Sequence, residues 1–338
     1  MINKRWNKSF KAIVSCLILV FIFALSGCGK KEPITLKQAM ENSNKMKSGY
    51  YSANMAMNLP GDEESIPINA QVSFDGAFDI ENEEKGKNEV NINLNMEDLG
   101  MDFQFPIVID TKSANDADIF ITIPTMFAQM MGLPEGKNVL YYNPKDIIKQ
   151  DEKTKHDEFL NSLTKFNESI NAIFDNFTKN NKGVLVFEEI EGKSIESNGK
   201  YLFNLNKEQS IKFMEALFAD EEVISLIEQM MQISESANPS EQKDTVGIEG
   251  FKEEFFTGLQ EVEEFNLEME TIINDGFITG VKYNVLITAE GQTMEMVFDY
   301  KIERINEAVE IKVPDKNDES VIKFSDLEKM QDELTVIQ

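Results

Sequence analysis

Cysteine, tryptophan and histidine are almost absent from this chain of 338 residues. The two cysteines are Cys16 and Cys28, the single tryptophan is Trp6, and the single histidine, His156, lies in a polar stretch. Zinc sites draw their ligands mainly from cysteine and histidine, and nucleophilic catalysis pairs serine or cysteine with a nearby base, usually histidine. These absences argue against a zinc enzyme, a disulfide scaffold and a histidine-dependent hydrolase.

Short motifs of enzymes and metal sites are also missing. The chain holds no phosphate-binding glycine loop, no dinucleotide fingerprint and no G-x-S-x-G elbow. Residues 315–319 are similar to the start of a calcium loop, but Ser320 stands where glycine is needed and Asp326 where glutamate is needed. The sequence therefore predicts a protein that is not an enzyme and has no cofactor and no metal site.

Positive charge is scarce as well. The chain has 33 lysines and arginines against 60 aspartates and glutamates, for a formal net charge of −27 at pH 7. Such a surface is repelled by nucleic acid and by anionic lipid headgroups. We therefore expect no nucleic-acid partner.

The beginning of the chain has the layout of a bacterial lipoprotein signal. Four basic residues precede the apolar run Ala12–Leu25, and Leu25-Ser26-Gly27-Cys28 follows as a lipobox. The alternative is a transmembrane anchor, but this run is shorter than the ~20 apolar residues that span a bilayer. We expect residues 1–27 to be a signal peptide, and residues 28–34 to be the lipidated Cys28 and a short tether. A diacylglyceryl group on Cys28 would then hold the protein at the outer face of the cell membrane.

Most of the chain after the tether alternates apolar and polar residues. A period of two indicates strands with one covered face, as in an antiparallel meander. Asn274-Asp275-Gly276 adds a hairpin signal, because glycine supplies the positive φ that the turn needs. The predicted strands cover residues 49–59, 66–80, 90–96, 101–109, 119–123, 184–187, 201–205, 265–273, 277–288, 293–302 and 308–313.

Helical periodicity occupies the start, the middle and the end of the chain. The predicted helices cover residues 35–46, 124–131, 157–177, 207–233, 248–259 and 325–334. Together the elements predict an α+β fold, a large curved antiparallel sheet (a half-barrel of roughly a dozen strands) with helices packed on its concave face. One continuous sheet and two packed lobes both fit this pattern.

Several segments make the chain similar to a known kind of lipoprotein. They are the lipobox Leu25–Cys28, the helix 36–46, the strand 48–59, Tyr201-Leu202-Phe203, Asp275-Gly276, Asn306 and the segment 309–314. This pattern resembles uncharacterised Gram-positive lipoproteins of the LolA/LppX/LprG-like fold. The resemblance implies a single domain over residues 35–338 whose half-barrel sheet encloses a hydrophobic cavity. It also implies the carriage of lipids or lipoproteins between membrane and envelope.

Apolar binding is the candidate activity that remains after these exclusions. The chain has 17 methionines and 24 phenylalanines, and thioether side chains adapt to ligands without a fixed shape, such as acyl chains. We expect the apolar strand residues to form the wall of a cavity and the helices to form its lid. The candidate lining residues are Met126, Phe127, Met130, Phe166, Phe174, Met214, Phe218, Ile227, Met230 and Met231.

Two interpretations of these residues stay open at this point. In the first, the protein is a membrane-anchored carrier of an acyl lipid or another apolar ligand. In the second, the same side chains fill a core, and an envelope interaction or sensor protein docks a basic protein partner through its acidic surface.

Overall fold

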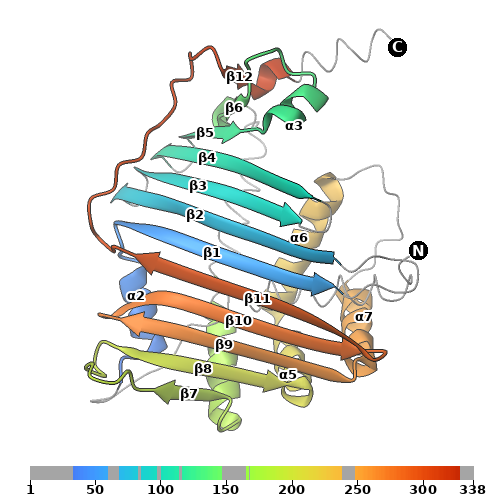
Figure 1. Cartoon of the computed structure of the whole chain (residues 1–338). Helices are drawn as coiled ribbons and strands as arrows, with labels where there is room; N and C mark the ends of the chain where they lie inside the picture. Colours follow the sequence, from blue (N-terminus) through green and yellow to red (C-terminus); the bar gives the residue numbers. More distant parts are fainter. Residues whose placement is uncertain are drawn as a thin grey trace. The chain divides into compact units, whose positions relative to one another are not determined.

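A computed structural model describes residues 33–59, 68–82, 85–96, 100–113, 116–146, 165–166, 168–237 and 248–327. Its strands are β1 (Ser48–Leu59), β2 (Ile68–Asn82), β3 (Lys85–Met96), β4 (Met101–Ser113), β5 (Asp116–Thr122), β6 (Val139–Tyr142), β7 (Leu185–Glu188), β8 (Gly199–Asn206), β9 (Glu264–Asn274), β10 (Phe277–Ala289), β11 (Gln292–Glu303) and β12 (Val321–Lys323). They form one 12-stranded sheet in the order β12-β6-β5-β4-β3-β2-β1-β11-β10-β9-β8-β7 (Figure 1).

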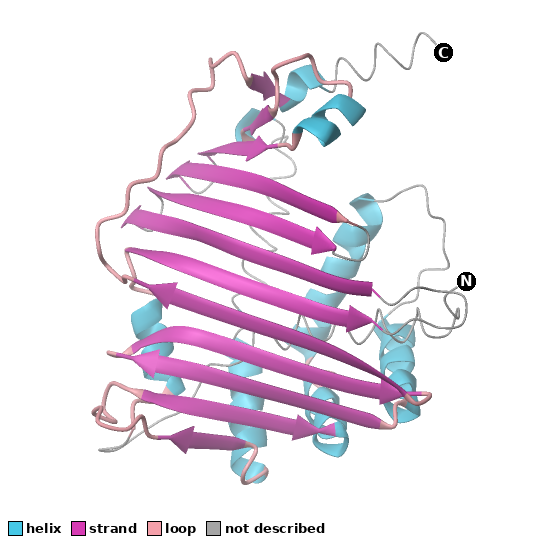
Figure 2. Ribbon diagram, viewed as in Figure 1, coloured by secondary structure: helices cyan, strands magenta, loops and turns pink. Residues whose placement is uncertain are grey.

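The helices come before, between and after the runs of strands (Figure 2). They are α2 (Leu36–Ser43), α3 (Thr125–Met130), the short turn η2 (Pro144–Asp146), α5 (Lys207–Leu217), α6 (Glu221–Ala237) and α7 (Ile248–Glu261), and residues 168–180 are also helical. A large, mostly antiparallel sheet with separate helices confirms the predicted α+β class.

The chain divides into two compact units. Unit 1 comprises Met1–Asn44, Met57–Ile68 and Asp151–Phe298, and unit 2 comprises Lys45–Ala56, Asn69–Gln150 and Asp299–Gln338. The single domain over residues 35–338 stays a prediction.

The helix that the sequence predicts from residue 35 and the predicted hairpin at Asp275-Gly276 are both present in unit 1. Thr35 caps α2 in a capping box, because its Oγ1 accepts from the Gln38 N–H while the Gln38 side chain accepts from the Thr35 N–H, both at 3.1 Å. The β9–β10 hairpin turns through Asp275 at φ 51° and Gly276 at φ 86°. Positive φ at both central residues gives the turn whose twist matches the flanking strands.

The helices of unit 1 cover one face of its strands. Residues of α5, α7 and the helix 168–180 form one buried apolar cluster with alternate residues of β8, β9 and β10. On α2, Leu36 and Ala39 are buried against Ile273 and Ile278 of β9 and β10. The period of two in β9 and β10 thus reflects a face that is closed over by helices.

Unit 2 combines long strands, such as the 15 residues of β2, with short described helices, such as the six residues of α3. In β2, Gly76 is required, because a Cβ there would overlap the Glu89 carbonyl oxygen and lie 2.7 Å from Tyr51 Oη. The Tyr51 O–H donates to Asn88 Oδ1 at 2.9 Å and also reaches the Glu89 carbonyl oxygen at 3.0 Å. Burial, reinforced by Tyr300 and by nearby carboxylates, raises the pKa of Tyr51 to about 12.

Two predicted elements are wrong in detail. The strand expected at 308–313 is not a strand, although Ile311 is buried, so its alternation reflects one-sided packing without a pairing partner. The helical region 207–233 is two helices, since Asp220 Oδ1 accepts from the backbone N–H groups of Glu222 and Val223 at 3.1 Å and starts α6.

Other parts of the prediction fall outside the described residues or were missed. Residues 157–164 of the predicted helix and the end of the last helix lie outside the described residues, which show helix at 168–180 and 324–327. Nothing in the sequence pattern indicated the short parallel pair of β12 with β6. Its strands have three and four residues, too few for a visible period.

Candidate functional site

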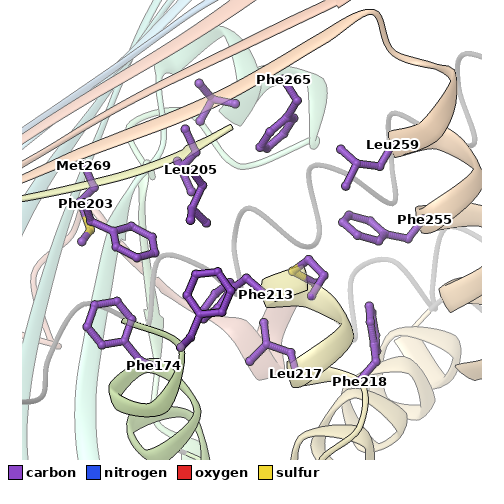
Figure 3. Close-up of a cluster of buried hydrophobic side chains, with 14 of the residues drawn as sticks. Phe174, Phe203, Leu205, Phe213, Leu217, Phe218, Phe255, Leu259, Phe265 and Met269 are labelled. Carbon is purple, nitrogen blue, oxygen red and sulfur yellow. The ribbon is translucent and has the colours of Figure 1, made fainter. Parts of the chain in front are cut away.

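The candidate lining residues of unit 1 lie in its packed interior. Phe174 of the helix 168–180 meets Phe203 of β8 with ring centroids 5.1 Å apart, and Phe213 of α5 lies 6.1 Å from Phe203 (Figure 3). Phe213 also meets Phe177 edge-on at 5.0 Å. Tilted and edge-to-face contacts of this kind stabilise aromatic pairs beyond the area they bury.

A second aromatic group extends the same cluster. Phe218, at the end of α5, lies within 6.2 Å of three rings of α7, those of Phe251, Phe255 and Phe256. Five of the predicted lining residues belong to this cluster, and all five are buried: Phe166, Phe174, Met214, Phe218 and Ile227.

The α3 residues of the candidate set belong to unit 2 and are not members of that cluster. The Phe127 ring lies 4.7 Å from Phe103 and 5.8 Å from Phe105, so α3 packs on β4 through this side chain. Met126 and Met130, by contrast, are 49% and 76% exposed. The structure therefore divides the predicted residues between the two units. The side chains of Met230 and Met231 lie outside the described residues.

The strand register of unit 2 assembles an apolar face around Phe103 and Phe105. Leu94 is the partner of Phe103, Ile92 of Phe105 and Val90 of Ile107 across the β3–β4 pair. Together with β2 and β5 this register places eleven apolar side chains on one face, here called the apolar face of unit 2: Val72, Phe74, Val90, Ile92, Leu94, Phe103, Phe105, Ile107, Ile109, Ile119 and Ile121.

Every member of the apolar face of unit 2 is half-buried. In unit 1 the corresponding residues of β9 are buried, as at Leu267, Met269 and Ile273. The two surfaces have the same period of two and differ in how completely they are covered. Sequence reasoning expected strand residues to form a wall, but it named only helix residues for the site. The alternation of β2 to β5 was the signal that identifies the strand residues.

The described residues also bear on metal binding and on membrane-spanning helices. Within the described ranges, no three histidine, cysteine, aspartate or glutamate side chains are grouped so as to hold a metal ion. In the part of the chain that is described, no helix is long and apolar enough to cross a bilayer. The predicted signal peptide, Cys28 and His156 lie outside the described residues.

Comparisons with known proteins yield structural likenesses alone. No family model matches the chain, and no curated protein matches it. Among solved structures, LprF from Mycobacterium bovis is 9% identical, with 82% of this chain and 94% of that one covered and a TM-score of 0.27.

A DUF1329 family protein from Desulfovibrio piger is 7% identical, with 81% of this chain and 90% of that one covered and a TM-score of 0.22. At these TM-scores the likenesses carry no argument about function. The site therefore has to be judged by its own geometry.

Proposed function

We propose that this protein binds an acyl lipid or a similar apolar ligand on the apolar face of unit 2, while a lipid on Cys28 anchors it outside the cell membrane. The half-buried state of that face is the observation that carries the proposal. Apolar surface left in water costs about 25 cal/mol per Å². Contiguous apolar patches on a protein surface therefore mark binding sites.

The shape and chemistry of the face fit an elongated apolar ligand. Its side chains come from four neighbouring strands, and the register pairs each of them with an uncharged residue. Phe127 of α3 already packs on this face, and Met126 and Met130 of the same helix are exposed. Flexible thioether side chains adjust to a ligand at low cost. In this proposal α3 is a movable cover, and β2 to β5 are the fixed wall.

Ligand retention is the direct test of this proposal. Residues 29–338, purified from a bacterial host, are analysed by native mass spectrometry and then extracted with solvent. We expect a reproducible extra mass that extracts as lipid. A bare polypeptide mass, still bare after incubation with mixed membrane lipids, would overturn the proposal.

A pair of substitutions locates the ligand. Val90 and Ile107 are cross-strand partners at the centre of the face, and threonine keeps their β-branched shape while adding a hydroxyl group. The double variant Val90→Thr/Ile107→Thr should lose most of the bound lipid. The control Val186→Thr changes an equally apolar, 41% exposed strand residue of unit 1 and should retain the lipid.

The anchor has a separate test with its own control. Cys28→Ala should abolish incorporation of labelled palmitate and release the protein from the membrane fraction. Cys16→Ala, which removes the other cysteine of the chain, should leave labelling unchanged. Equal labelling of the Cys28→Ala variant would refute lipidation at this residue.

A further inference from the structure

A polar pocket of about 370 Å³ lies in unit 2, at the end of the sheet where β4, β5, β6 and β12 meet. Four lysines and two aspartates supply its charged side chains. The lining residues are Lys112, Asp116, Asp118, Tyr141, Asn143, Lys145, Lys316, Asn317 and Lys323. In a chain with a net charge of −27, a pocket with an excess of lysine over acid is unusual and needs a physical reason.

Asp118 is the buried centre of this pocket, with 6% of the residue exposed. Its carboxylate accepts hydrogen bonds from the Lys112 ammonium, from the Tyr141 O–H at 2.8 Å and from Asn143 Nδ2 at 2.9 Å. Burial acts to raise the pKa of Asp118, but these three donors outweigh burial and lower the pKa below its usual value. Asp118 is therefore ionised at neutral pH, and its charge is matched by Lys112.

Asp116 is matched in the same way. Its carboxylate accepts from the Lys145 ammonium and from Asn143 Nδ2, the latter at 3.1 Å. These hydrogen bonds, that of Lys145 first, lower the pKa of Asp116 below its usual value. Both acids of the pocket thus have one lysine each. Two further lysines of the lining have no such counterpart.

Those two are Lys316, in the loop before β12, and Lys323, on β12 itself. Neither forms an ion pair with any residue in the described ranges, and both side chains are exposed at the pocket. Two acids of the loop, Asp315 and Asp318, accept hydrogen bonds from the loop backbone. Asp315 Oδ1 accepts from the Asn317 N–H at 2.9 Å, and Asp318 Oδ1 accepts from the Ser320 N–H at 2.9 Å.

The sheet brings these lysines to the paired acids. Lys323 stands opposite Tyr141 in the parallel pair of β12 with β6, and Tyr141 stands opposite Phe120 in the antiparallel pair of β6 with β5. Paired residues share a face, so Lys323 projects on the same side as Asp118, two residues before Phe120. A short strand from the end of the chain thus completes a site begun by β4 and β5.

We propose that this pocket binds a phosphate monoester, with Lys316 and Lys323 as the residues that hold its charge. A phosphate monoester carries about −1.5 to −2 charges at pH 7 and offers three strong acceptor oxygens. This charge matches the two ammonium groups that remain after Lys112 and Lys145 are paired. A monocarboxylate would leave one lysine unmatched. The phosphate can belong to a soluble ester or to the headgroup of a phosphatidate.

This site is independent of the apolar ligand proposed above. Ile119 belongs to the apolar face of unit 2, whereas Asp118 and Phe120 on either side of it project to the opposite face of β5. The failure of one proposal therefore leaves the other standing.

Calorimetric titration of the full-length protein in a non-ionic detergent tests the phosphate site. The probes are inorganic phosphate, glycerol 3-phosphate and water-soluble dihexanoyl phosphatidate. We expect saturable binding that the variant Lys316→Ala/Lys323→Ala weakens roughly tenfold or more, since hydrogen bonds between charged groups are the strong ones. The control Lys179→Ala/Lys182→Ala removes the same charge from exposed positions of unit 1 and should bind as the unchanged protein does.

The probes also separate the two sources of phosphate. Equal affinity for glycerol 3-phosphate and the phosphatidate supports a soluble ester, and lysine-dependent binding that is tighter for the phosphatidate supports a lipid headgroup. The proposal is overturned if none of the probes binds saturably, or if the Lys316→Ala/Lys323→Ala variant binds them as tightly as the control does.

Discussion

The strands of unit 1 and unit 2 share one sequence pattern and differ in how far it is buried. In β9, the alternate residues Leu267 and Met269 are buried beneath helices that carry many aromatic side chains, and Ile273 is buried against α2. In β3 and β4, the alternate residues of the apolar face of unit 2 are half-buried. A period of two thus tells which side of a strand is apolar, and the neighbouring elements decide whether that side is buried or only half-buried.

The largest expected effect belongs to the aromatic core of unit 1. Phe213→Ala removes a ring that is 1% exposed and contacts both Phe177 and Phe203. We expect the free energy of unfolding to fall by about 3–5 kcal/mol, because the substitution leaves a cavity among packed rings. Urea denaturation measures it. A loss under about 1 kcal/mol would show that this cluster is not the tightly packed core described here.

A substitution on the strands of unit 2 should have the next largest effect. Gly76→Ala places a methyl group against the Glu89 carbonyl oxygen and the Tyr51 hydroxyl, and backbone atoms cannot yield as a side-chain end can. We expect a loss of about 2–3 kcal/mol in the same denaturation experiment. Gly132→Ala is the control, since nothing lies within 4 Å of its Cβ position, and it carries only the cost of its positive φ of 70°. Equal losses in the two variants would remove the packing argument for Gly76.

The direct counterpart of Phe213→Ala in unit 2 is Phe105→Ala. The Phe105 ring is half-buried and lies 5.8 Å from Phe127. Since less apolar surface leaves water at this position, we expect a loss of only about 1–2 kcal/mol without ligand. The added acyl lipid should stabilise the unchanged protein more than the variant. If Phe105→Ala costs as much as Phe213→Ala, the contrast between the two units is wrong.

Loss of the Asp118 ion pair in the pocket of unit 2 should lower the free energy of unfolding less than the core substitutions above. The lowered pKa of Asp118 means that its stabilising contribution is complete above the unfolded-state pKa of about 3.9 and is lost as pH falls through the lower folded-state value. Asp118→Asn should therefore cost about 1 kcal/mol at pH 7 and flatten the pH dependence of stability below pH ~4. Denaturation at several pH values measures this, with the exposed Asp102→Asn as control. An unchanged acid slope in Asp118→Asn would contradict the assigned ion pair.

Lys112, the partner of Asp118, makes the free energy of unfolding depend on pH in the alkaline range as well. The hydrogen bond to Asp118 raises the pKa of Lys112, so its contribution is complete below about pH 10.4 and is lost as pH rises through the higher folded-state value.

The long strands, the hairpin at Asp275-Gly276 and the helices of unit 1 could all be predicted from the sequence. Each depends on a local signal, such as the period of two or the positive φ at Gly276. The break between α5 and α6 also has a local signal, the capping side chain of Asp220, although the predicted helix 207–233 runs through it. The pairing of β12 with β6 had no local signal, because the long segment Asp151–Phe298 of unit 1 separates Val321 from its partner Val139 in the sequence.

The sequence led to the proposal of an apolar site, but it did not locate the half-buried face of unit 2. The abundance of methionine and phenylalanine indicated apolar binding, yet Phe174 and Phe218 lie in the closed core of unit 1. Composition and helical periodicity cannot separate a buried ring from one that faces a ligand, because both obey the same spacing. The degree of burial at Phe105 or Ile107 depends on which elements cover the strand, and this is a property of the tertiary structure.

Photo-crosslinking tests the central claim most directly. An acyl chain that carries a diazirine is bound to residues 29–338 and activated, and the labelled peptides are mapped by mass spectrometry. We predict adducts in the β3 and β4 segments that hold Val90–Leu94 and Phe103–Ile109, and their loss in the variant Val90→Thr/Ile107→Thr. Adducts confined to peptides of unit 1, such as those that contain Phe213, would contradict the account.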